Sequence, residues 1–139
     1  MKTKLVLLGA VAALCGCGGM QQNVSPVPRF EGREVCIVEN PRVRRSFLDA
    51  YVLALKGRGY EARVLPSSAQ LSACAIVSQY VALWGFDTFA SYLSHADIRV
   101  YQKTQPAGRA VYNGNRFVNA EEKVQELVDK LFTKGDTRE

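Results

Sequence analysis

The first sixteen residues limit how much of this chain can belong to a folded domain. Lys2 and Lys4 precede an apolar run of about ten residues that ends at Leu14. A helix needs roughly 20 apolar residues to cross a membrane, so this run is too short to span one. A basic start followed by a short apolar run is typical of a cleaved export signal. We therefore expect residues 1–16 to be a signal peptide; the alternative is a buried N-terminal helix.

The segment Leu14-Cys15-Gly16-Cys17 matches the lipobox of bacterial lipoprotein precursors. In that motif an aliphatic residue and two small residues precede the cysteine whose thiol carries the lipid. The sequence thus predicts cleavage before Cys17 and acylation of Cys17, with palmitate among the chains. Each buried methylene contributes about 0.8 kcal/mol, so two or three chains anchor firmly. Because Gly18, not Asp, follows Cys17, we expect the periplasmic face of the outer membrane rather than the inner membrane.

Length and charge are those of one ordinary domain. The chain has 139 residues and a formal net charge of +5, from 18 basic and 13 acidic side chains. Loss of residues 1–16 removes Lys2 and Lys4, which leaves a net charge of +3. A mildly basic exported domain does not indicate nucleic acid. The expected partners are the membrane, through the N-terminal lipid, and an envelope protein.

Residues 17–32 are rich in Gly, Gln, Ser and Pro and show little apolar periodicity. Such a composition is typical of a flexible tether, which could hold the domain about 40 Å from the bilayer. The pattern then changes, and residues 33–135 are predicted to form a single periplasmic α+β domain.

Within that domain, short β-prone runs alternate with two amphipathic segments. Asn40-Pro41 resembles a helix start, with Asn as N-cap and Pro in the first turn. The clearest helix follows Asn119, with Glu121 and Glu122 in its first turn. The predicted order is β-α-β-β-β(-β)-α. We expect a two-layer sandwich in which both helices cover one face of a four- to five-stranded, mostly antiparallel sheet.

Several residues of this domain are similar to those of the Sbal-type family of uncharacterised proteobacterial lipoproteins. They are the segment 35–41, Val43, Cys74, Trp84, Asp87 and the run 92–96. The resemblance covers residues 35–103, with the departure that Gly85 and Phe86 separate Trp84 from Asp87. It implies a lipoprotein of unknown function, so it supports the predicted location and supplies no activity.

Cys36 and Cys74 remain after processing and acylation. In an oxidising compartment they are expected to pair, and closing a loop of this length stabilises a fold by roughly 3–4 kcal/mol on the chain-entropy model. The alternative is two buried free thiols, because strand cysteines often pack as small apolar side chains.

No group of residues has the pattern of a catalytic, metal or cofactor site. His95 lies between Ser94 and Asp97, but on a strand Ser94 points away from the other two, so a Ser-His-Asp triad is not expected. One histidine and two paired cysteines leave too few ligands for a metal. The prediction is therefore a non-enzymatic protein without a cofactor.

Two clusters are candidates for contact with a partner. Arg42, Arg44 and Arg45 lie near the start of the first predicted helix, where positive charge opposes the helix dipole. They are a candidate anionic contact, for lipid headgroups or a protein, or else a solvated face. Trp84, Phe86, Phe89 and Tyr92 form a candidate aromatic contact patch, or else part of the core.

The predicted function is thus an interaction or assembly module tethered to the outer membrane. The alternative is a lipoprotein that binds a small ligand or the cell wall in a cleft beside the sheet.

Overall fold

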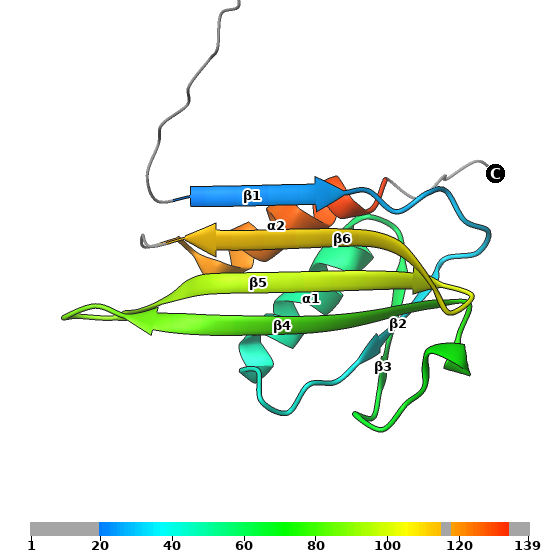
Figure 1. Cartoon of the computed structure of the whole chain (residues 1–139), viewed down its shortest axis with the longest axis horizontal. Coiled ribbons are helices and arrows are strands. Elements are labelled where there is room, and N and C mark those ends of the chain that lie inside the picture. The colour runs from blue at the N-terminus through cyan, green and yellow to red at the C-terminus, as the bar shows by residue number, and fades with distance from the viewer. Residues whose placement is uncertain (1–19, 115–117, 134–139) are drawn as a thin grey trace, which may run out of the picture.

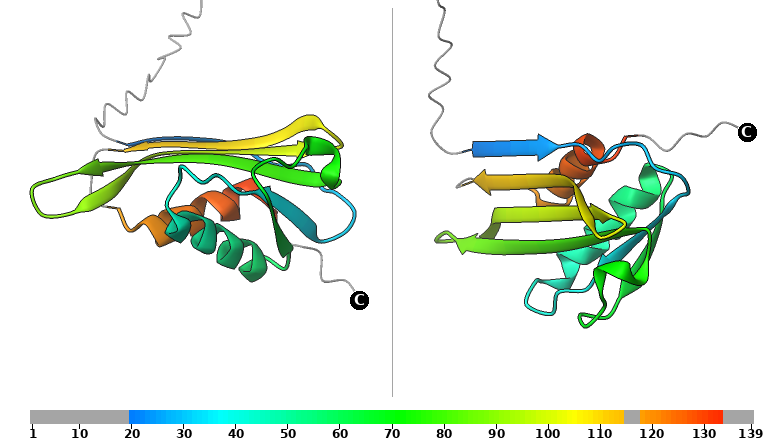
Figure 2. Two further views of the ribbon diagram at one scale, coloured as in Figure 1. Left: turned by 90° about the horizontal axis from the view of Figure 1, so that it is seen from below. Right: turned by 45° about the vertical axis from the view of Figure 1, so that its right-hand side comes forward.

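The computed structural model describes residues 20–114 and 118–133. In these ranges the elements are β1 (Met20–Ser25), β2 (Glu34–Val38), α1 (Arg45–Gly57), β3 (Glu61–Leu65), a 3-10 turn (Leu71–Ala73), β4 (Ile76–Phe86), β5 (Ser91–Gln102), β6 (Gln105–Gly114) and α2 (Ala120–Leu131). The strands form one sheet in the order β1-β6-β5-β4-β2-β3 (Figure 1). Both helices cover the same face of this sheet, as the left view of Figure 2 shows. The predicted α+β class is therefore confirmed.

The predicted strand number was wrong, because the sheet has six strands among the described residues instead of four to five. Most of its strand pairing is antiparallel, as predicted, and part of it is parallel. Strand β2 runs parallel to both β3 and β4, whereas β4, β5, β6 and β1 pair antiparallel. The parallel pairing of β2 with β3 has a simple cause. The helix between them, α1, is a crossover connection, and such a connection joins parallel strands.

The additional strand, β1, lies inside the segment predicted as a tether. It pairs with β6 from Met20 opposite Gly114 to Ser25 opposite Arg109. After it, Val27 is buried and its backbone N–H donates to the carbonyl of Leu131 at 2.8 Å. The tether prediction is therefore wrong for residues 20–25. Their polar composition concealed an edge strand, because a strand at an edge is held by backbone hydrogen bonds rather than by an apolar face.

The first helix begins later than the sequence predicted. Asn40 starts a turn instead, in which its side-chain Oδ1 accepts from the N–H of Arg42 and its carbonyl accepts from Val43. The helix α1 begins at Arg45, and its stripe of buried residues packs on the sheet: Phe47, Leu48, Tyr51, Ala54 and Leu55. The second helix begins as predicted, since the Asn119 side chain accepts from the N–H groups of Glu121 and Glu122.

The main core lies between the two helices and the sheet. One polar contact crosses it: Tyr51 Oη donates to Ser78 Oγ at 2.7 Å, and Ser78 Oγ donates to the carbonyl of Arg99 at 3.1 Å. Burial raises the pKa of Tyr51 far above its ordinary value, so its hydroxyl stays protonated and available as a donor. These two hydrogen bonds connect α1 to β4 and β5.

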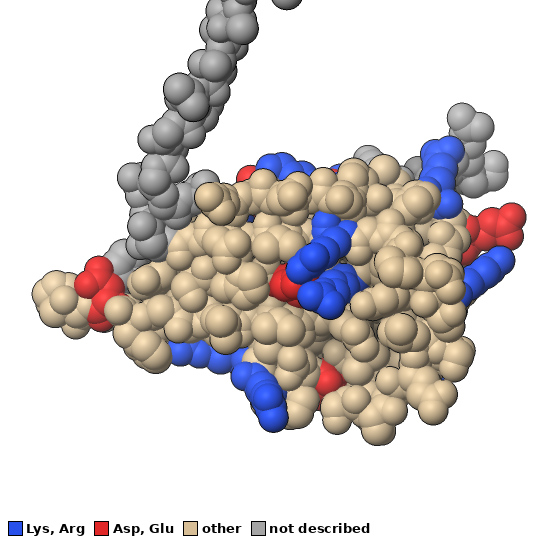
Figure 3. All heavy atoms as spheres, viewed as in Figure 1, with Lys and Arg blue, Asp and Glu red and all other residues tan. Residues whose placement is uncertain are grey.

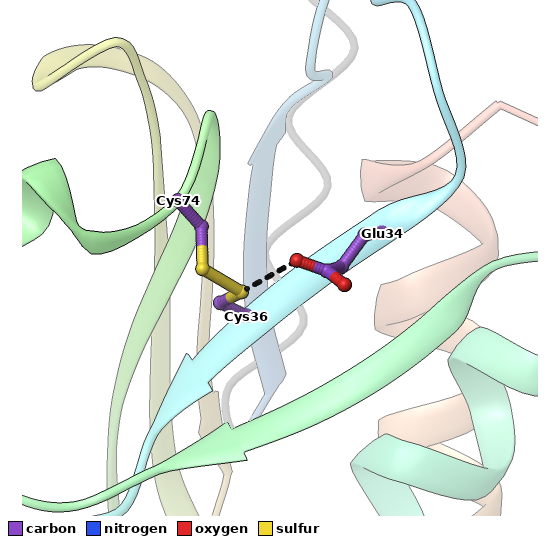
Figure 4. The surroundings of a disulfide bond; sticks show 3 residues. All are labelled: Glu34, Cys36 and Cys74. Carbon is purple, nitrogen blue, oxygen red and sulfur yellow. Dashed lines mark hydrogen bonds between the residues drawn. A yellow bond between two sulfur atoms is a disulfide. The ribbon is translucent and has the colours of Figure 1, made fainter.

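Cys36 and Cys74 form a disulfide, which confirms the predicted pair. It joins β2 to the segment before β4, with the two Cα atoms 6.3 Å apart (Figure 4). Around it, Val38, Leu65 and Val77 form a second small core on the sheet face opposite the helices. Glu34 Oε1 lies 3.3 Å from Cys36 Sγ. This is a close contact and not a true hydrogen bond, because a disulfide sulfur carries no proton.

Candidate contact surface at one end of the sheet

The hairpin between β4 and β5 extends beyond the rest of the sheet (Figures 1 and 2). Phe86 and Phe89 lie at its tip, with 78% and 94% of their surface exposed. Two exposed aromatic side chains three residues apart make this tip a candidate contact site. We call this end of the sheet the hairpin end, and the opposite end, which carries Cys36 and Cys74, the disulfide end.

The other two residues of the predicted aromatic patch are partly buried. Trp84 meets Phe47 of α1 edge-on, with ring centroids 6.3 Å apart. Tyr92 lies over the backbone of Gly85, so closely that a Cβ atom there would be 2.5 Å from Tyr92 Cζ. The patch thus has a base that packs on the domain and a tip that faces solvent.

Arg44 joins this patch from another part of the chain. Its guanidinium carbon lies 4.7 Å from the centre of the Trp84 ring and 5.9 Å from that of Phe86. Its Nη1 also donates to Ser91 Oγ at 3.0 Å. Stacking on an aromatic face leaves the guanidinium charge available on its outer side. We define the hairpin patch as Arg44, Trp84, Phe86, Phe89 and Tyr92.

The predicted arginine cluster is divided by the structure. Arg45, the first residue of α1, pairs with Glu39 at 3.1 Å and with Asp49 at 3.3 Å. Arg42 is exposed in the turn before the helix. Only Arg44, of these three, contacts the aromatic residues. No spacing in the sequence could reveal that contact, because the two segments are about 40 residues apart and meet through the fold.

The first described residue lies at the hairpin end of the sheet. Met20 pairs with Gly114, Asn113 pairs with His95, and His95 pairs with Leu83, three residues before the end of β4. Cys17 and the predicted signal peptide lie outside the described residues. Three residues of extended chain span at most about 11 Å. The distance from Cys17 to Met20 cannot exceed that length.

The residues considered for catalysis each contact a different partner. Ser94 Oγ donates to the carbonyl of Leu83, and His95 Nδ1 is 2.6 Å from Asn113 Oδ1. Asp97 binds Arg109 and Arg99. The structure does not bring Ser94, His95 and Asp97 together as a triad.

A carboxylate oxygen of Glu34 and the Sγ atoms of Cys36 and Cys74 lie within 4.8 Å of one another, but both sulfurs belong to the disulfide. A metal binds thiolates, which this oxidised pair does not supply.

In the described part of the chain no helix is both long enough and apolar enough to cross a membrane.

The architecture defines the class of protein: a six-stranded mixed sheet with two helices on one face. Two solved structures share it, both of PelC from Paraburkholderia phytofirmans, one of them a point variant, and both described as dodecamers. Each has a TM-score of 0.58 and 13% identity, and the alignments cover 80% of this chain and 94% or 95% of PelC. At this identity the likeness shows the fold. No protein-family model matches the chain, and none of the curated proteins matches it significantly.

Proposed function

We propose that this protein is a lipid-anchored, non-enzymatic interaction and assembly module on the periplasmic face of the outer membrane. The observation that carries the proposal is the position of the hairpin patch. It lies at the end of the sheet where β1 begins, three residues after Cys17. Acyl chains on Cys17 would therefore hold the exposed aromatic residues at the surface of the bilayer, and not some 40 Å away on a tether.

The composition of the hairpin patch suits a bilayer surface. Trp and Tyr side chains favour the boundary between headgroups and hydrocarbon, where their rings are partly buried and their polar atoms stay hydrated. Membrane affinity grows with the apolar area that is buried and with attraction of basic groups to anionic lipids. Phe86 and Phe89 supply apolar area, and Arg44 supplies the charge beside them. In this arrangement the lipid anchors the chain and the patch orients the domain.

The fold supports the assembly part of the proposal. PelC, which has the same architecture, forms dodecamers, so this sheet-and-helix unit is compatible with a many-copy complex. We extend that property to this chain as part of the proposed function. Membership of the Sbal-type lipoprotein family likewise remains a proposal, and it agrees with the same location.

Trp84, the single tryptophan of the chain, allows a direct test of the membrane contact. The full chain, purified from envelopes, is placed in vesicles whose acyl chains carry bromine near the headgroup. We expect quenching of Trp84 fluorescence, and weaker quenching in a Phe86→Ser/Phe89→Ser variant. Val64→Ser is the control, since it removes an apolar side chain with 38% of its surface exposed from strand β3, outside the hairpin patch.

Two results would contradict the proposal. A Cys17→Ser chain that still fractionates with outer membranes on a density gradient would rule out the lipid anchor. Quenching that is absent, or equal in all the variants, would rule out the hairpin patch as a membrane contact.

A further inference from the structure

The outer surface of the two helices contains a groove of about 740 Å³. Its apolar part is formed by Ala50 and Leu53 of α1, and Leu53 has 70% of its surface exposed. A large aliphatic side chain in such a position contributes nothing to the core of its own domain. The groove is therefore an apolar surface that lacks a covering element among the described residues.

The rim of this groove is acidic. Five carboxylates line it, and Lys130 is the single basic residue among the lining side chains; the acidic residues are Asp49, Glu121, Glu122, Glu126 and Asp129. Hydrogen bonds from Lys123 and then Lys130 lower the pKa of Glu126, although its partial burial opposes this shift. Glu126 is therefore ionised at neutral pH. Asp49 also pairs with Arg45, Asp129 with Arg58, and Glu126 with Lys123. Five carboxylates against these three cations and Lys130 leave a net charge of −1, which Glu121 and Glu122 carry beside the apolar floor.

The opposite side of the molecule is the uncovered face of the sheet. Ala96, Ile98 and Val100 point to the helices, so by strand alternation Asp97 and Arg99 point to this open face. Leu83 and Val81 of β4 are 57% and 46% exposed. Figure 3 shows this face as largely uncharged, with basic side chains around an acidic one near its middle.

The charge on the open face is positive. Asp97 accepts from Arg109 Nε at 3.0 Å and Nη2 at 2.8 Å, and from Arg99 Nη2 at 3.3 Å. Burial alone would raise the pKa of Asp97, but the hydrogen bonds and charges of Arg109 and Arg99 lower it below its ordinary value. One carboxylate thus fixes two guanidinium groups, and the half-exposed arginines keep a net charge of about +1.

We propose that the occupant of the acidic groove is a second copy of this chain, which presents its open sheet face. Leu83 and Val81 of one copy would cover Leu53 of the next, and Arg99 and Arg109 would meet the acidic rim. Two opposite faces of one protomer with complementary charge produce a head-to-tail contact, which closes into a ring or extends into a filament. This inference rests on the assembly part of the proposed function.

The geometry of the membrane anchor agrees with this contact. The helices lie directly behind the sheet, so the groove and the open face occupy the same length of the molecule (Figures 1 and 2). If the copies are related by rotation about an axis parallel to the strands, all their hairpin ends lie at the same height along that axis. Every hairpin patch could then face the same bilayer. If the hairpin tip instead inserted into a neighbour's groove, each copy would be shifted along the strand direction. The hairpin ends would then no longer lie at the same height.

The test uses two variants, each blocked on one face. Leu83→Glu places a negative charge on the open face, which the acidic rim of a neighbour would repel. Leu53→Arg places a positive charge in the groove, which Arg99 and Arg109 would repel. Full chains are extracted in mild detergent, and their masses are measured by native mass spectrometry. Gln105→Arg, a charged substitution at the exposed first residue of β6, is the matched control.

We expect the unchanged chain and the control to form many-copy complexes. Each blocked variant alone is expected to be a monomer with an unchanged thermal melt, and an equimolar mixture of the two should form 1:1 hetero-complexes. Blocked variants that still assemble, or a mixture that stays monomeric, would overturn the proposed interface. If the blocked variants still assemble, the complex uses another surface and the assembly function stands. If the unchanged chain is a monomer, both the proposed interface and the assembly function are refuted. Monomers that bind a cationic small molecule in the groove would support a ligand site instead.

Discussion

The two ends of the sheet use apolar side chains in opposite ways. At the disulfide end, Val38, Leu65 and Val77 are buried in a second small core beside the Cys36–Cys74 bond. At the hairpin end, Phe86 and Phe89 are larger side chains, and both face solvent. One end therefore buries its apolar side chains in the fold, while the other leaves them exposed.

We propose that this difference separates stability from membrane contact within one sheet. Changes at the disulfide end should lower the free energy of unfolding and leave membrane contact unchanged in the folded protein. Changes at the hairpin tip should weaken membrane contact and leave the free energy of unfolding unchanged.

Replacement of Cys36 and Cys74 together by Ala should have the largest effect. The bond closes a loop with a sequence separation of 38, and its loss should cost about 3–4 kcal/mol of unfolding free energy on the chain-entropy model. Urea unfolding followed by circular dichroism measures this value. Reductant should destabilise the unchanged chain by a similar amount and leave the double variant unaffected. A chain whose unfolding is insensitive to reductant would contradict the stabilising role of the bond.

Two glycines allow the ends to be compared with the same substitution. A Cβ atom at Gly108 would lie 2.6 Å from Val27 Cγ2, 3.0 Å from the Val27 backbone nitrogen and 3.1 Å from the Ser25 carbonyl oxygen. At Gly85 the nearest atoms are the far end of the Tyr92 side chain, which can move. Gly108→Ala should therefore displace the chain after β1 and cost roughly 1–3 kcal/mol. Gly85→Ala should cost less.

The same urea titrations measure both glycine variants. Hydrogen exchange should also show faster exchange in β1 for Gly108→Ala alone. Equal costs at the two positions would mean that β1 is not held as an integral strand, and that the segment behaves as the tether that its composition suggests.

Asp97→Asn should have a smaller effect, with a defined pH dependence. The folded-state pKa of Asp97 lies below its ordinary value of 3.8. The ion pair with Arg109 therefore stabilises the fold above that pH, and the contribution disappears as the pH falls through the folded-state pKa. We expect a loss of about 1 kcal/mol at neutral pH, since both arginines are half-exposed. The difference from the unchanged chain should shrink as the pH falls below 3.8; a difference independent of pH would argue against the ion pair.

Features of this fold that depend on residues close in sequence could be predicted, whereas features that depend on residues distant in sequence could not. Periodicity found the buried stripe of α1 and the cap of α2, because helix faces and caps depend on residues within four positions. The Cys36–Cys74 pair followed from the compartment and from a count of cysteines. Strand β1 was missed, because its Gln and Asn residues are held in place by the β6 backbone. Pairing partners of this kind leave no local signal.

The contact surface was predicted in its parts and not as a whole. Trp84, Phe86, Phe89 and Tyr92 are close in sequence, so their grouping could be inferred. Their exposure could not, because the same pattern suits a core. Arg44 joins them only because α1 begins beside the base of the hairpin. The closeness of the patch to Cys17 likewise depends on the β1–β6 pairing, which the polar sequence concealed.

The two ends of the sheet differ most at the hairpin tip, where the apolar side chains are exposed. Phe86→Ser/Phe89→Ser removes two aromatic side chains that bury little surface, so the unfolding free energy in solution should stay within about 0.5 kcal/mol of the unchanged chain. Loss of two buried aromatic side chains would instead cost several kcal/mol. Urea unfolding and Trp84 quenching on the same samples separate the two possibilities. A large fall in stability would mean that the tip is buried in the folded protein and is not a free contact surface. Unchanged stability with weakened quenching would assign these residues to the membrane contact, and equal weakening in Val64→Ser would argue against that assignment.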